Sequence, residues 1–187
     1  MALATAHGVA HCVAQGRILQ GWALAMQGDA ATGVAQIQQG WEAVQQGGQQ
    51  LYRPYQLALL AEAYGQAGQP AAGLPCLAEA VTRVAATEER WWEAEVYRLQ
   101  GELLLRLPRP EIPQAIACLH QALDVARRQQ ARALELRAAL SLSRLWQQHG
   151  KRAEASSLLA PIYGWFTEGL DTADQQDAKV RLEELGG

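Results

Sequence analysis

Four stretches of this chain repeat one pattern of small and large residues at a spacing of about 40 positions. In each stretch a small residue is followed, four positions later, by a large apolar one. The small residues are Gly33, Gly73, Ala115 and Ala155, and the large ones are Ile37, Leu77, Leu119 and Leu159. A repeat of about 20 to 50 residues is typical of solenoids, whose units bury their apolar faces only by stacking on one another. The spacing therefore predicts a stack of similar units.

The composition indicates that these units are helical. The chain is rich in Ala, Leu, Gln and Glu and poor in aromatic residues other than its six tryptophans, and these abundant residues favour helices. At 187 residues it has the length of one domain. We expect an all-α fold, a right-handed α-solenoid of helix-turn-helix repeats with a C-terminal capping helix. The expected repeats span about 10–50, 51–87, 88–130 and 131–169, and the capping helix spans about 172–185.

Turn and cap signals set the expected helix boundaries. Glycine accepts the left-handed conformation that ends a helix, so Gly28, Gly68 and Gly150 predict turns. One long helix is expected over 88–107, and Pro161 predicts a kink or break in the last helix of the fourth repeat.

The expected capping helix begins with a recognisable signal. Thr172 and Gln175 have the spacing of a capping box, in which each side chain binds a free backbone amide of the helix start. Ala178, Leu182 and Leu185 form a narrow apolar stripe, and charged residues cover the rest of the helix. One polar face is what a terminal solenoid element needs.

Charge and hydropathy exclude several classes of function. The net charge of −3 gives no basic field for nucleic acid or anionic lipid, and no apolar run is long enough to span a bilayer. The N-terminus lacks the features of a signal peptide, so we expect a cytoplasmic protein. The three cysteines are odd in number and lack C-x-x-C spacing. Cys76 and Cys118 are equivalent in successive repeats, which predicts buried packing residues.

The residues that could carry chemistry are sparse. His7 and His11, followed by Cys12, form at most half of a zinc site. The serines lie within expected helices and without a nucleophile elbow. Adjacent carboxylates on a helix point about 100° apart and do not form an acid–base pair. We therefore expect no catalytic residue, no metal and no cofactor.

The small and large positions resemble the tetratricopeptide repeat (TPR). The resemblance rests on Leu57, Leu60, Ala61, Tyr64, Gly68, Gly73, Leu77 and Ala80, and again on Ala139, Leu142, Ser143, Trp146, Gly150, Ala155 and Leu159. The period here is 40 to 42 residues, longer than the 34 of the basic TPR unit, as in the extended repeats of large bacterial regulators. The resemblance implies a module for protein–protein interaction. Repeat 1 departs most, with Arg17 and Gln20 at apolar positions.

A second resemblance concerns the whole chain. Segments 158–174, 21–23 and 90–102 resemble the C-terminal part of bacterial regulators that join a class III nucleotide-cyclase domain, an AAA-type ATPase and a repeat region. The resemblance implies that the chain is the carboxyl end of a larger signalling protein or a stand-alone relative. The phosphate loop and the cyclase metal-binding aspartates are absent from the sequence, so we expect no nucleotide chemistry.

The first helix of each repeat should turn one face toward a binding groove. The repeat register predicts that the groove face changes from apolar to basic along the chain. Ile18, Gln66 and Glu95 are also predicted on this face. The principal groove residues are Trp22, Met26, Tyr55, Glu62, Arg98, Glu102, Arg137, Arg144 and Gln148. The arginines from Arg127 onward could serve an acidic partner, or they could simply compensate helix C-termini.

We therefore expect a non-enzymatic module that binds a protein or peptide, with a homodimer through the exposed edge of the first repeat as a further expectation. The alternative is a structural element that packs in cis on ATPase and cyclase domains and has no ligand of its own. An exposed groove favours the first hypothesis, and a groove filled by the chain's own C-terminal helix favours the second. A small enzyme or metal protein is the third and weakest alternative.

Overall fold

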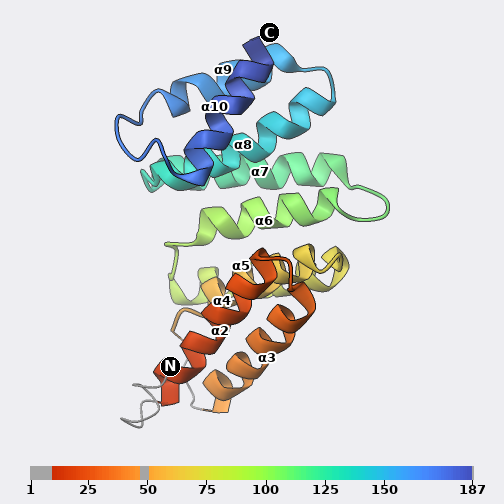
Figure 1. Cartoon of the computed structure of the whole chain (residues 1–187), viewed down its shortest axis with the longest axis vertical. Helices are drawn as coiled ribbons and strands as arrows, with labels where there is room; N and C mark the ends of the chain where they lie inside the picture. Colours follow the sequence, from red (N-terminus) through yellow and green to blue (C-terminus); the bar gives the residue numbers. More distant parts are fainter. Residues whose placement is uncertain (1–9, 47–50, 187) are drawn as a thin grey trace. The chain divides into compact units, whose positions relative to one another are not determined.

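The computed structural model describes residues 10–46 and 51–186, and this part of the chain contains nine α-helices and no β-strand (Figure 1). The prediction of an all-α fold is confirmed. The helices are α2 (Ala10–Met26), α3 (Ala30–Gln46), α4 (Arg53–Gln66), α5 (Pro70–Thr87), α6 (Glu93–Leu105), α7 (Ile112–Arg128), α8 (Arg132–Gln148), α9 (Arg152–Tyr163) and α10 (Ala173–Gly186). Within these ranges no helix is both long enough and apolar enough to cross a membrane.

The helices group into two compact units. Unit 1 comprises residues 1–92 and 103–110, and unit 2 comprises residues 93–102 and 111–187. Most of α6 therefore belongs to unit 2, and its last turn belongs to unit 1.

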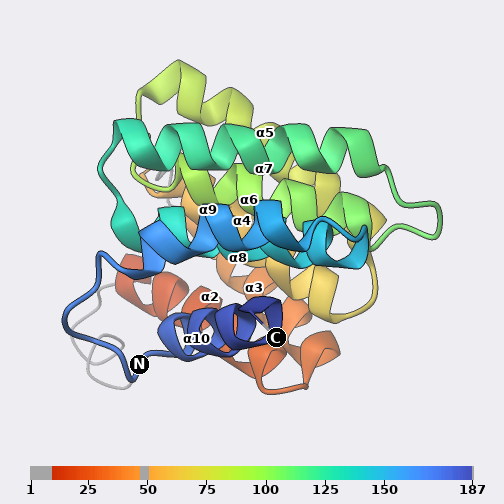
Figure 2. The same ribbon diagram turned by 90° about the horizontal axis from the view of Figure 1, so that it is seen from above.

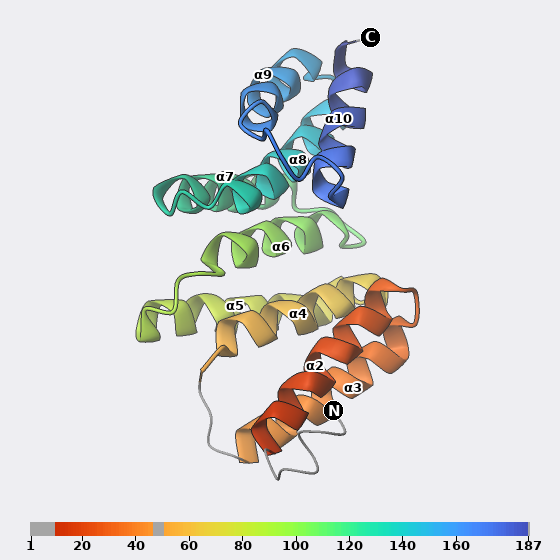
Figure 3. The ribbon, with the colours of Figure 1, turned by 60° about the vertical axis from the view of Figure 1, so that its left-hand side comes forward.

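Unit 1 consists mainly of two helical hairpins, α2–α3 and α4–α5, whose members lie side by side (Figures 1 and 3). The predicted turns are present, because Gly28 and Gly68 have φ angles of 101° and 70°. Ile37, Val44 and Leu59 are among the buried residues of its core. Ile18 also lies in this core and is 1% exposed, so its predicted place on a groove face is wrong: its position on α2 faces α3.

Unit 2 contains the first ten residues of α6 together with α7, α8, α9 and α10. The helix-to-helix turns of this unit also contain residues with left-handed backbone conformation. Gln130 lies in the turn before α8, and Gly150 lies in the turn before α9. Ala94 of α6 and Val125 of α7 form a small core with Leu134 of α8 packed against it. The capping helix α10 lies against α9 and α8 (Figure 2), and its predicted stripe residues Ala178 and Leu185 are buried.

Small residues let the backbones of the two helices in each hairpin pack closely against each other. A Cβ added at Gly33 would lie 2.5 Å from the Gly21 carbonyl oxygen, and one added at Gly73 would lie 2.9 Å from that of Ala61. In unit 2, a Cβ added at Gly101 would lie 3.1 Å from the Ala115 carbonyl oxygen. The four large residues of the repeat pattern are buried with no exposed surface: Ile37, Leu77, Leu119 and Leu159.

The helix predicted over 88–107 is wrong at its beginning. Helix α5 continues to Thr87 and ends there because Glu88 has a φ angle of 57°, in the left-handed region. Helix α6 begins only at Glu93. The sequence concealed this break because no glycine or proline occupies it.

The structure also bears on three smaller predictions: the capping box, the kink or break at Pro161 and the burial of two cysteines. Thr172 donates its hydroxyl to the Gly169 carbonyl oxygen, and the Gln175 side-chain oxygen has no hydrogen-bond partner, so the predicted capping box does not form. Pro161 lies inside α9, which continues to Tyr163, so the helix does not break at Pro161, while a kink there stays a prediction. Cys76 and Cys118 are half-buried rather than buried.

The close approach at Gly73 generates a test. Alanine stabilises an exposed helix interior by about 1 kcal/mol over glycine, but here its Cβ would lie 2.6 Å from Leu103 Cδ1 and 2.9 Å from the Ala61 oxygen. We expect Gly73→Ala to lower the free energy of unfolding by about 1–3 kcal/mol, as overpacking does. Gly186→Ala is the control, because nothing lies within 4 Å of that Cβ position. Urea denaturation measures both; equal stabilities would contradict the close packing.

Candidate functional site

The predicted groove residues divide between the two units. Trp22, Met26, Tyr55 and Glu62 belong to unit 1, while the others, from Arg98 to Gln148, belong to unit 2. Each unit therefore presents its own candidate surface.

In unit 1, predicted residues of α2 and α4 contact one another. The indole Nε1 of Trp22 donates to Glu62 Oε2 at 2.7 Å, and the Gln66 amide nitrogen lies 4.0 Å from the sulfur of Met26. Trp22, Met26 and Glu62 are half-buried and Gln66 is exposed. The structure thus brings these residues together on one strip of surface, which we call the α2–α4 strip.

Four aromatic residues, Tyr55 among them, cluster near the start of α4. The Tyr55 ring lies 5.1 Å from that of Trp91 and 5.3 Å from that of Trp92, and the Tyr52 ring lies 6.2 Å from that of Trp91. We call Tyr52, Tyr55, Trp91 and Trp92 the aromatic patch. Tyr52 is 43% exposed and Trp91 is 45% exposed. Large aromatic side chains with this much free surface are the usual anchors of protein interfaces.

Acidic side chains border both features. Glu89 accepts from the backbone amide of Tyr52 and from the indole of Trp91, each at 3.2 Å. Burial raises the pKa of the Tyr55 phenol, and the negative charge of Glu62 raises this pKa further. Tyr55 therefore stays neutral at physiological pH and offers a hydroxyl rather than a charge.

In unit 2, a buried carboxylate organises the predicted arginines. Glu95 is 1% exposed and accepts from Arg98 Nε and Nη2 at 2.9 and 2.7 Å, and from Arg137 Nη2 at 2.9 Å. Arg98 also donates to Ser141 Oγ at 3.3 Å. A buried carboxylate with several charge-assisted hydrogen bonds is fully compensated. These residues join α6 to α8 and serve the structure of the unit.

The capping helix covers the rest of this face. Arg144 pairs with Asp177 of α10, and Arg137 Nε lies 3.8 Å from Asp174 of the same helix. Arg181 of α10 donates to the Gln147 side chain at 2.7 Å. The surface predicted to be basic is thus neutralised by carboxylates of its own unit, which sequence periodicity could not show.

Two remaining predicted residues lie at the edge of this network. Glu102 lies 3.7 Å from Arg98 and 3.9 Å from Arg144. Gln148, the last residue of α8, is exposed.

The arginines at the α7–α8 turn are also paired. Arg127 and Arg132 both bind Glu135, at 2.9 and 2.7 Å. The Arg132 guanidinium in addition lies 3.8 Å from the ring centre of Trp165. Trp165 is 63% exposed, and its outer surface is open to solvent beside this contact.

The described residues show little that could bind a metal. Among residues 10–46 and 51–186 no group of three or more His, Cys, Asp and Glu is placed to hold an ion. His7 lies outside these ranges, and Cys12 is exposed. Burial raises the thiol pKa of Cys76 and Cys118, with repulsion from Glu79 a second cause at Cys76. A higher pKa leaves less of the reactive thiolate at neutral pH.

Comparison with solved structures identifies the fold. A crystal structure of the nearly identical TPR-like repeats of a protein assigned as a kinesin light chain, from Podospora anserina, matches with a TM-score of 0.68, 16% identity, and coverage of 91% of this chain and 84% of that one. A variant of the same protein with a single substitution matches with a TM-score of 0.69, 15% identity and the same coverage. The fold is TPR-like. No protein-family model and no curated protein sequence matches the chain. The predicted TPR-like architecture is confirmed, whereas the resemblance to ATPase and cyclase regulators stays a prediction.

Of the four residues of the aromatic patch, the repeat register predicts only Tyr55 as a binding residue. A signal was present: Tyr52 and Trp92 each directly precede the first helix of a TPR-like pair, 40 positions apart. This interval equals the repeat period. It therefore predicts that the two residues occupy equivalent positions in successive repeats, but it does not predict which rings contact each other.

The buried carboxylate of Glu95 can be tested by one substitution. Glu95→Gln keeps the shape but removes the charge that compensates two arginines, so we expect a loss of about 3 kcal/mol in the free energy of unfolding. Glu154→Gln, at an exposed position of α9, should change it by less than about 0.5 kcal/mol. Chemical denaturation measures both, and a Glu95→Gln protein as stable as wild type would contradict the assigned role.

Proposed function

We propose that this chain is a non-catalytic helical-repeat module that binds a protein or peptide through unit 1, using the α2–α4 strip and the aromatic patch. The observation that carries the proposal is the exposure of Tyr52 and Trp91 beside Tyr55, which was predicted to be a binding residue. The TPR-like fold supports it, since helical repeats commonly present extended binding surfaces. That support is an analogy of fold.

The chemistry of this surface suggests the type of partner. Indole and phenol rings with Glu62 and Glu89 at their borders favour an apolar anchor flanked by hydrogen-bond donors or positive charge. This expectation replaces the acidic partner that the predicted arginine face favoured, because those arginines are already paired within unit 2.

Affinity capture with matched variants tests the proposal. The full chain serves as bait in a lysate of the native host, beside Trp91→Ala and Val180→Ala; Val180 is similarly exposed, at 52%, on α10. We expect a partner recovered by wild type and by Val180→Ala but reduced at least tenfold by Trp91→Ala, as for an anchor worth about 2 kcal/mol. A partner retained equally by all three folded baits would place binding elsewhere.

One observation favours the alternative of a structural element without its own ligand. The α8 face of unit 2 is covered by α10 through Arg144–Asp177 and Arg181–Gln147 contacts. For unit 2, a face filled by the chain's own C-terminal helix supports this alternative. If no bait recovers a specific partner, the structural role becomes the better explanation for the whole chain.

We also propose, from the sequence resemblance, that the chain is the C-terminal part of a larger cytoplasmic signalling protein of the ATPase and cyclase type. An antibody against the 187 residues should then detect a much larger protein in the native host. A band at the size of the chain alone would contradict this. The homodimer stays a prediction that sedimentation at several concentrations can test; Leu19 of α2, 44% exposed, is a suitable position for Leu19→Gln.

A further inference from the structure

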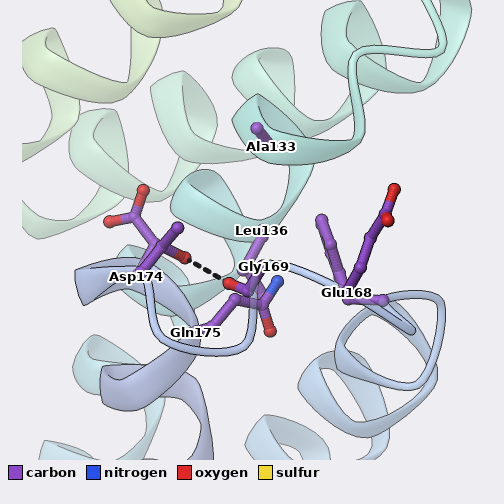
Figure 4. Close-up of a pocket in the computed structure, with 8 residues that line it drawn as sticks. Ala133, Leu136, Glu168, Gly169, Asp174 and Gln175 are labelled. Atoms are coloured by element: carbon purple, nitrogen blue, oxygen red, sulfur yellow. Dashed lines mark hydrogen bonds between the residues drawn. The ribbon is translucent and has the colours of Figure 1, made fainter.

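A pocket of about 290 Å³ lies in unit 2, between α8, the loop 164–172 and the first turn of α10 (Figure 4). Its volume is near the lower end of the range for pockets that hold small molecules. Thr172 Oγ1 donates to the Gly169 carbonyl oxygen at 3.0 Å and so stabilises the turn at the end of this loop. The lining residues beyond these two are Ala133, Leu136, Phe166, Glu168, Asp174 and Gln175.

The Gln175 side chain is the most informative part of the lining. It is 3% exposed, and its Oε1 accepts no hydrogen bond from the part of the chain that the structure describes. Of the described residues that have a buried side-chain atom without a partner, Gln175 lines the pocket. An unsatisfied buried acceptor costs about 1–3 kcal/mol, so its place in a residue that lines the pocket points to a donor that is supplied from outside.

The charge of the lining defines that donor further. Figure 4 shows Glu168 and Asp174 on opposite sides of Gly169 and Gln175. Asp174 is only loosely paired with Arg137, at 3.8 Å. Among the described residues no Lys or Arg lines the pocket, while Leu136 and Phe166 supply an apolar wall. Carboxylates and an amide oxygen beside an apolar wall match a positively charged donor on a short apolar chain.

We propose that this pocket binds an ammonium or guanidinium group carried on a short aliphatic chain, with Gln175 Oε1 accepting its hydrogen bond and Glu168 and Asp174 balancing its charge. A lysine or arginine side chain of a protein partner has this chemistry, and so does a free alkylamine. The site is independent of the aromatic patch, since all of its residues belong to unit 2.

The first experiment is a titration of the full chain with n-butylammonium, followed by NMR of the Gly169 backbone amide and the Gln175 side-chain amide. We expect saturable shifts at both, and at least about tenfold weaker binding of neutral n-butanol, because the alcohol lacks the charge. Equal binding of the two compounds, or no saturable shift, would overturn the proposal.

Variants separate the polar contact from general packing. Gln175→Met removes the acceptor at similar volume, so n-butylammonium should bind about tenfold more weakly while the free protein melts at a higher temperature, because an unsatisfied buried group is gone. Gln56→Met is the control, since Gln56 is equally buried but lies in unit 1; it should leave binding unchanged. Wild-type affinity in Gln175→Met would overturn the assignment.

Further variants test the contribution of the Glu168 charge and the need for an open pocket. Glu168→Gln should weaken binding by about threefold to fivefold, a modest factor because Glu168 is exposed, and Glu154→Gln should not change it. Ala133→Phe should fill the pocket from its exposed position and abolish binding, whereas Ala160→Phe, exposed on α9, should not. Binding retained in both pocket variants would contradict the proposal.

A comparison of ligands distinguishes the two sources. The peptide acetyl-Gly-Lys-Gly-amide is titrated beside n-butylammonium and the same peptide with acetylated lysine. Tighter binding of the lysine peptide by tenfold or more indicates a protein partner, and similar binding of peptide and amine indicates a free amine. If the acetylated peptide binds as well as the lysine peptide, the positive charge is not recognised and the proposal fails.

Discussion

The close approach of paired helix backbones is the constraint on which the rest of the structure depends. Gly21 faces Gly33 and Ala61 faces Gly73 in unit 1, and Gly101 faces Ala115 in unit 2. In the last pair, Ser143 donates its hydroxyl to the Ala155 carbonyl oxygen at 3.3 Å. With side chains this small, the large residue four positions after the second member can reach the core, which is why Ile37, Leu77, Leu119 and Leu159 are buried completely.

Once the hairpins pack this tightly, the first helix of each pair has a limited surface left, and the two units use it differently. In unit 2 the buried Glu95 gathers Arg98 and Arg137, and α10 supplies Asp177 to Arg144. The charged side chains of this face thus pair with one another and join the helices of the unit. In unit 1 aromatic rings occupy the corresponding helix start, and Tyr52 and Trp91 remain open to solvent. The best candidate for recognition is therefore apolar and aromatic rather than basic.

The C-terminal segment both caps the last repeat and forms part of a pocket, and the sequence pattern predicts only the first of these roles. Helix α10 covers apolar surface with Ala178 and Leu185, as a terminal cap should. Its first turn, however, contains the buried Gln175, which lines a pocket and whose Oε1 has no hydrogen-bond partner among the described residues. A cap alone has no need of such an unsatisfied group, which is why the pocket carries the further inference.

The sequence by itself determined the helical class, the repeat length, most of the turns and the buried large residues, because each of these follows from local periodicity and from glycine or proline. It also placed Trp22 and Glu62 on one surface. Only the tertiary structure decided that α5 ends at a left-handed Glu88, that Ile18 is a core residue and that α10 neutralises the arginine face. The last two features depend on contacts between residues far apart in the chain, and a repeat period specifies equivalent positions but not which side chains meet. The break at Glu88 lacks the glycine or proline that would mark it in the sequence.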